Sequence, residues 1–191
     1  MLRRFLGLGA EGRTRSAADP AESPSVAASA EETETVRRIV QRLDAMPQEH
    51  ARFVACFAYI LSRAANADLA VSDDETRLMG KLLVEFGGLD EGQAVLVVEI
   101  AKLQSQLYGA TEDYLVTREF ARLANDEQRL ALLRSCFLVA ATDQTITADE
   151  ASVVNEIARE LGVDRPTLNA VREQFVDNLS VIQRMRREEQ A

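Results

Sequence analysis

Large hydrophobic residues recur along most of the chain at steps of three and four positions, which is the spacing of one face of an α-helix. Val36, Ile39, Val40 and Leu43 follow this pattern, and the segment 48–67 is apolar on most of its sides. No segment shows the sustained alternation of apolar and polar residues that is typical of a strand. The pattern therefore predicts an all-α fold, a compact bundle of about eight or nine helices, with segment 48–67 central to the core.

Helix starts and stops are marked by residues with a clear physical role. Asp90, Asn125 and Asp164 precede apolar helical patterns and are good N-caps, whereas Gly87-Gly88 and Gly162 follow such patterns and favour a helix end. Thr111 begins a further helical pattern that runs through Leu123. The expected helices cover residues 33–46, 48–67, 73–87, 91–109, 111–123, 126–142, 149–161 and 165–182.

Two acidic segments in the chain repeat one pattern. "NADLAVSDDE" at 66–75 and "ATDQTITADE" at 141–150 share an Asp, a β-branched residue, a hydroxyl residue and a closing acidic pair, at a constant offset of 143 − 68 = 75 residues. Each segment lies between two predicted helices. The sequence therefore predicts two pseudo-symmetric helix-loop-helix repeats.

One interpretation of these segments is structural. Ser72 with Glu75, and Thr147 with Glu150, have the spacing of a capping box, in which the hydroxyl and the carboxylate each accept a hydrogen bond from a backbone amide. Capping explains the hydroxyl residues and the acids that follow them. It gives no role to Asp68 and Asp143, which lie four residues before the caps.

The second interpretation is a metal site. If Glu75 and Glu150 are aligned with the last ligand of an EF-hand loop, Asp68 and Asp143 fall on its fifth position, but Leu69 and Gln144 replace the glycine that follows it. The first half of that loop is also missing, which excludes a regular EF-hand. Carboxylates from both repeats would suit Mg²⁺, Mn²⁺ or Ca²⁺, since the single histidine and two cysteines lie away from these segments.

Charge and composition narrow the classes of partner. The formal net charge is −9, and an acidic protein repels the phosphates of nucleic acids, so no nucleic-acid partner is expected. The three arginines of "RMRREEQA" at 184–191 are interleaved with glutamates, as in a solvated helix end. We expect a protein partner instead.

The first 30 residues differ from the remainder, residues 31–191, which form the predicted helical domain. Residues 10–30 hold mostly Ala, Ser, Pro and Glu, which bury too little apolar surface to order a chain, so a disordered tail is predicted for 1–30. No stretch is long and apolar enough for a transmembrane segment, although residues 1–8 have the character of a weak contact with a membrane surface. Cys56 and Cys136 lie in apolar helical runs and suit a reducing, cytoplasmic location.

No constellation of catalytic residues is present. His50 lies in a polar first turn, and "GLGAEG" near the start lacks the preceding strand of a dinucleotide-binding loop. The sequence therefore predicts a protein without enzymatic activity.

The segments "RAANADLAVSDDE" and "VAATDQTITADE", with Leu-Gly-Val at 161–163, resemble the TerB-like proteins of tellurite resistance and the related N-terminal domain of the DjlA co-chaperones. The resemblance covers about residues 49–175. The chain lacks the His-Pro-Asp turn of a J-domain. It implies a compact helical module linked to tellurite or general stress resistance. It also implies divalent metal binding through Asp68, Glu75, Asp143 and Glu150. The alternative is a scaffold for protein interactions, co-chaperone-like in character, in which these acids only cap helices.

Overall fold

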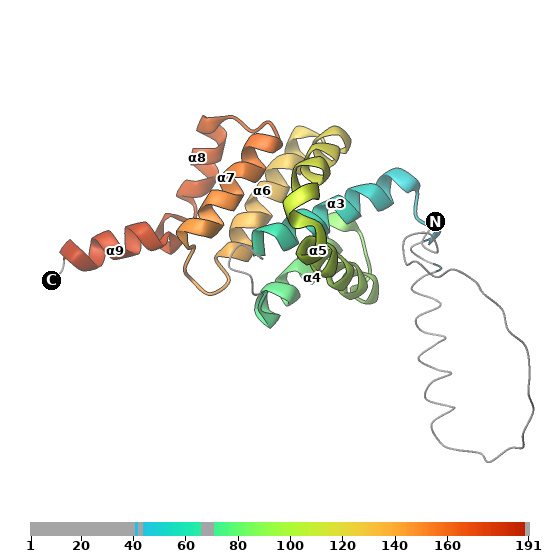
Figure 1. The fold of residues 1–191 in the computed structure, drawn as a ribbon, viewed down its shortest axis with the longest axis horizontal. Coiled ribbons are helices and arrows are strands. Elements are labelled where there is room, and N and C mark those ends of the chain that lie inside the picture. The colour runs from blue at the N-terminus through green and yellow to red at the C-terminus, as the bar shows by residue number, and fades with distance from the viewer. Residues whose placement is uncertain (1–40, 42–43, 66–70, 190–191) are drawn as a thin grey trace, which may run out of the picture. The chain divides into compact units, whose positions relative to one another are not determined.

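The computed structural model describes residues 41, 44–65 and 71–189, and the helices below lie in the unit from Gln48 to Ala191 (Figure 1). Within the described residues the chain is helical, and a single isolated β-bridge joins Ile146 to Leu179. The predicted all-α fold is therefore confirmed. The elements are α3 (Gln48–Ala65), α4 (Asp73–Gly87), α5 (Glu91–Leu123), α6 (Asp126–Ala140), α7 (Ala148–Glu160), α8 (Arg165–Glu173), the 3-10 helix η2 (Val176–Asn178) and α9 (Ser180–Glu189).

Helix α3 lies at the centre of this unit, as its apolar sequence predicts. It packs against α4, α5, α6 and α7, and its second half is buried on every side. Phe53 and Phe57 form an aromatic cluster with Phe120 of α5, with ring centroids 5.0 and 6.1 Å from the Phe120 ring. The remaining core is built from large side chains of α4, α6 and α7, including Met79, Leu83, Leu132, Phe137 and Ile157.

The N-caps predicted at Asp90, Asn125 and Asp164 are formed. The side chains of Asp90, Asn125 and Asp164 each accept a hydrogen bond from the backbone amide three residues later. Gly88 and Gly162 follow helices with φ of 64° and 74°, a left-handed conformation that glycine adopts without steric cost. These local signals mark the end of α4 and the start of α5, the start of α6, and the end of α7 and the start of α8.

The sequence prediction was wrong at residues 109–111, where it placed a break between two helices. The structure has one helix of 33 residues, α5, which continues through Gly109. Thr111 does not cap a new helix, because its hydroxyl donates back to the carbonyl of Tyr108 at 3.0 Å. An interior glycine costs about 1 kcal/mol relative to alanine, whereas a break would leave several backbone amides and carbonyls without partners.

The prediction was also wrong at the C-terminal end, where one helix was expected from residue 165 to 182. The structure ends α8 at Glu173 and begins α9 at Ser180, with η2 between them. The break occurs because backbone groups here bind the second acidic segment. The Ile146 amide donates to the Asn178 carbonyl at 2.7 Å, and the Ser180 amide donates to the Ile146 carbonyl at 2.9 Å.

Three predictions fall outside the described residues. They are the disordered tail at 1–30, the membrane contact of residues 1–8 within it, and the helix at 33–46 apart from positions 41 and 44–46. In the part of the chain that the structure describes, no helix has the length and apolar character needed to cross a membrane.

Candidate functional site

The first acidic segment leads into α4 through a complete capping box. The Ser72 hydroxyl accepts a hydrogen bond from the Glu75 amide at 3.2 Å. In return, Oε2 of Glu75 accepts from the Ser72 amide at 2.7 Å and from the Ser72 hydroxyl at 2.8 Å. The carboxylate of Glu75 is thus one half of the capping box. Glu75 is only 7% exposed.

The second acidic segment repeats this geometry at the start of α7. The Thr147 hydroxyl accepts from the Glu150 amide at 3.2 Å, and Oε2 of Glu150 accepts from both the amide and the hydroxyl of Thr147 at 2.8 Å. Glu150 is 6% exposed. The two boxes agree to within 0.1 Å in every paired distance, so the sequence repeat is also a repeat in local structure.

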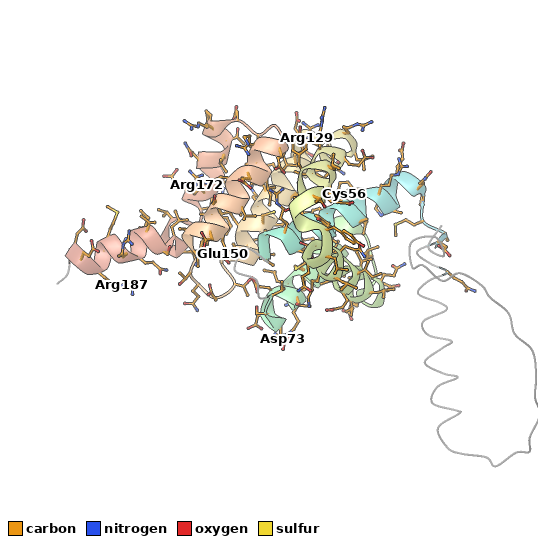
Figure 2. The ribbon with its side chains drawn as sticks, in the orientation of Figure 1. Cys56, Asp73, Arg129, Glu150, Arg172 and Arg187 are labelled. Atoms are coloured by element: carbon orange, nitrogen blue, oxygen red, sulfur yellow. The ribbon has the colours of Figure 1, made fainter. Side chains whose placement is uncertain are left out.

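The other acids of these first helical turns face solvent. Asp73, Asp74 and Asp149 are exposed, and Figure 2 shows Asp73 at the start of α4 and Glu150 at the start of α7. An anion in the first turn of a helix interacts favourably with the helix dipole, by about 0.3–1 kcal/mol. Capping and dipole effects together explain these residues.

Asp143 and Gln144 form a tight turn ahead of the second cap. Oδ1 of Asp143 accepts from the Thr145 amide at 2.9 Å, and the Asp143 side chain is exposed. Gln144 has φ of 69°, which makes it the one non-glycine residue with positive φ among the described residues. This is the position where an EF-hand loop has glycine, so the backbone makes that turn here without glycine.

Residues near the C-terminus hold this turn in place. The carbonyl of Gln144 accepts from the side-chain amides of Asn178 and Gln183, at 3.2 and 3.0 Å. Together with the bridge at Ile146, these bonds fix the backbone of the second acidic segment. These contacts were not predicted from the sequence, because the apolar spacing places Asn178 in the interior of a continuous helix.

The four predicted metal ligands differ in what the structure shows of them. Asp68 lies outside the described residues, Glu75 and Glu150 each use Oε2 in a cap, and Asp143 is exposed. Helices α3 and α6 pack together, and Figure 1 shows their C-terminal ends on the same side of the bundle. The described residues alone contain no group of three or more His, Cys, Asp or Glu side chains placed to hold a metal ion. Metal binding therefore stays a prediction that depends on Asp68.

A buried arginine joins the helices that flank the two acidic segments. Arg63, in the last turn of α3, is 8% exposed, and its Nη1 and Nη2 donate to both carboxylate oxygens of Glu160 in α7, at 2.6 and 3.3 Å. Nη2 also donates to Glu156 at 3.2 Å. On the α5 side, Nη1 donates to the Thr117 hydroxyl at 3.2 Å, and Nε lies 3.2 Å from Oδ2 of Asp113. All three guanidinium nitrogens are therefore engaged, and Arg63 joins α3 to two other helices, α5 and α7.

The electrostatics of this network follow from its burial. Burial would lower the pKa of Arg63, but the hydrogen bond to Glu160 and the charges of Asp113, Glu160 and Glu156 outweigh it, so the pKa is raised. Burial raises the pKa of Asp113, and the positive charge of Arg63 opposes that change. The hydroxyl of Tyr59 donates to Oδ1 of Asp113 at 3.0 Å, and burial next to this carboxylate raises the pKa of Tyr59.

This network was not predicted from the sequence. The signal was Arg63 itself, a charged residue in the run "AYILSRAA" of a helix that is apolar on most sides. A buried charge requires paired partners, but the partners lie about 50 and 100 residues away in sequence, beyond the reach of local spacing.

Both cysteines are buried and free, as their apolar surroundings predict. Burial raises the pKa of the Cys56 thiol to about 11 and that of the Cys136 thiol to about 12. Thiols with such pKa values stay protonated near neutral pH and are poor nucleophiles. His50 stacks on Phe53 with ring centroids 6.4 Å apart, in the first turn of α3.

Comparison with known proteins supports the resemblance described above. A family model with the description "Tellurite resistance protein TerB" matches residues 54–173, which include both acidic segments and the Arg63 network. We found no match to the chain among curated proteins or among solved structures.

Proposed function

Because the chain belongs to the TerB family, we propose that it is a non-enzymatic helical module that acts in resistance to tellurite or to general stress. The observation that carries this proposal is the family match over residues 54–173, and the pair of capping boxes fits it. In each acidic segment the buried glutamate is an integral part of a helix start, as expected of a structural module.

The chemistry of the described side chains supports a role without catalysis. The two thiols are buried and protonated, and the guanidinium of the buried Arg63 is held by the carboxylates of Asp113, Glu156 and Glu160. We propose that the module acts by binding another protein. Its two free cysteines are compatible with a cytoplasmic location, since a reducing compartment keeps thiols unpaired.

Growth on tellurite tests the proposed role. Cells that lack the protein should grow less well on tellurite than the parent strain, and the full chain should restore growth. Equal growth of the two strains would contradict a role in tellurite resistance. The purified protein should leave the concentration of added tellurite unchanged, and steady consumption of tellurite would contradict a non-enzymatic role.

The second candidate function is binding of a divalent cation, Ca²⁺, Mg²⁺ or Mn²⁺, by Asp68, Glu75, Asp143 and Glu150. The observation that favours it is the left-handed Gln144 directly after Asp143, since oxygen-ligand loops require a sharp turn at this position. A bound cation would relieve the repulsion between the carboxylates of the two segments. In the alternative, the module is purely a scaffold, and the acids serve only as caps.

Calorimetric titration separates the two candidates. Wild-type protein should release or absorb heat with at least one of the three cations, and the variant carrying Asp68→Ala and Asp143→Ala should not. The matched control carries Asp73→Ala and Asp149→Ala, which remove exposed acids of the same helix starts and should leave binding intact. A wild type that gives no heat signal would contradict metal binding. A signal that is unchanged in the variant with Asp68→Ala and Asp143→Ala would contradict binding by these residues.

A further inference from the structure

Helix α5 has a second apolar face that the helical bundle does not use. Val98, Ala101 and Ser105 point into the bundle and are buried. On the opposite side, Leu103 is 54% exposed, Leu107 is 61% exposed and Tyr114 is 52% exposed. Figure 1 shows α5 in front of α3. Several large apolar side chains exposed on one side of a helix are typical of an interaction site.

The residues of this face have the spacing of a coiled-coil seam. The α5 seam consists of Leu96, Ile100, Leu103, Leu107 and Tyr114, at steps of four, three, four and seven residues. Leu96 and Ile100 are partly exposed and extend the stripe towards the start of α5. Alternating steps of three and four let the side chains of one helix fit between those of another, so the partner that fits this seam is a helix.

The charge distribution indicates which helix binds the α5 seam. The chain carries a net charge of −9, yet the stretch 103–111, "LQSQLYGAT", contains no charged residue. An exposed helix surface without charge allows a like-charged molecule to approach, and depletion of charge is typical of the centre of protein interfaces. A second copy of this chain meets both requirements, because it presents a helix with the same spacing and the same uncharged stretch.

A tyrosine and an arginine extend the seam at its C-terminal end. The guanidinium carbon of Arg118 lies 5.9 Å from the centroid of the Tyr114 ring, and Nη1 of Arg118 lies 3.5 Å from the Tyr114 hydroxyl. Both side chains are exposed, and Tyr and Arg are among the residue types enriched at the energetic centres of interfaces.

We propose that the α5 seam is a self-association surface, at which two copies of the chain pair through their α5 helices in a symmetric dimer. The pairing buries Leu103 and Leu107 of both copies at the centre of the interface. This inference goes beyond the proposed function, and it depends neither on tellurite nor on metal.

Sedimentation equilibrium of the full 191-residue chain tests the proposal, at chain concentrations from about 1 µM to about 200 µM. The wild type should shift from monomer to dimer with concentration. The variant with Leu103→Gln and Leu107→Gln should weaken the dimer at least tenfold, because glutamine keeps the helix but removes apolar contact. Its melting temperature at low concentration should match that of the monomeric wild type.

The matched control is Val181→Gln with Met185→Gln, which changes two apolar residues of α9 that are exposed to a similar degree, 47% and 50%. This control should dimerise like the wild type. A wild type that stays monomeric at every concentration, or a seam variant that dimerises as strongly as the wild type, would overturn the proposal. A dimer lost equally in the control would also overturn it, since the contact would then not be specific to α5.

Discussion

Replacing Arg63 with alanine should destabilise the protein more than any single surface change. The variant leaves the carboxylate of Glu160, which is 9% exposed, without the guanidinium that binds both of its oxygens. It also removes the positive partner of Asp113 and Glu156. The loss of one partner from a buried ion pair costs about 3–5 kcal/mol, because the remaining charge is buried and uncompensated.

A chain of this length loses about 2–4 °C of melting temperature per kcal/mol, so the variant should melt roughly 6–20 °C below the wild type. The assay is thermal unfolding followed by circular dichroism, at neutral pH and without added metal. The matched control is Arg77→Ala, which breaks an ion pair with Asp74 in which both side chains are exposed. Such pairs contribute about 0–1 kcal/mol, so this control should melt within a few degrees of the wild type. If Arg63→Ala and Arg77→Ala melt together, the inference that the buried network holds α3, α5 and α7 in place is wrong.

Three further predictions concern pH, the Gln144 turn and the N-terminal tail. The raised pKa of Asp113 means that the native state holds this proton to higher pH than the unfolded chain, so its contribution to stability is present at low pH and lost as pH rises. Removal of Arg63 raises the pKa of Asp113 further, so in the variant this carboxyl is protonated at higher pH. The melting temperature of Arg63→Ala should therefore approach that of the wild type as pH falls from about 7 to about 4. A difference in melting temperature that stays constant with pH would contradict this. Gln144→Gly should raise the free energy of unfolding, measured in urea, by up to about 1 kcal/mol. The substitution removes the cost of a left-handed φ at a non-glycine residue, about 1–2 kcal/mol. Glycine also gives the unfolded chain more conformational freedom, which offsets part of this gain. Gln174→Gly, at a residue with φ of −66°, should lower the same quantity, and a loss of stability in both variants would refute the argument. A chain that starts at Glu31 should keep the melting temperature of the full chain, because residues 1–30 have too little apolar content to contribute to a core, and a large drop would count against this.

The features that the sequence predicted correctly are those fixed by short-range chemistry. Ser72 with Glu75 and Thr147 with Glu150 meet within a single turn, so their spacing alone specifies the cap. Gly88 is similar, because the left-handed conformation at a helix end is a property of one residue and its immediate neighbours.

The features that the sequence did not predict depend on contacts between distant segments. Gly109 has a weak helix propensity, but α5 continues through it because the helix packs along α3. Conversely, residues 174–179 have a helical pattern, but their backbone groups bind Ile146 instead. Arg63 and its partners in α5 and α7 come together only once the bundle is assembled. In each case contacts between distant segments, and not the local sequence, determine the structure.

We infer that the two acidic segments stabilise the starts of helices α4 and α7 through their capping boxes, whether or not a cation is present. The most direct test is the free energy of unfolding of Ser72→Ala and Thr147→Ala, measured in urea with a chelator and again with excess Ca²⁺, Mg²⁺ or Mn²⁺. Each variant should lose about 0.5–2 kcal/mol relative to the wild type, by the same amount in both conditions. Wild-type stability of both variants with the chelator, or a loss that occurs only when metal is present, would contradict the claim.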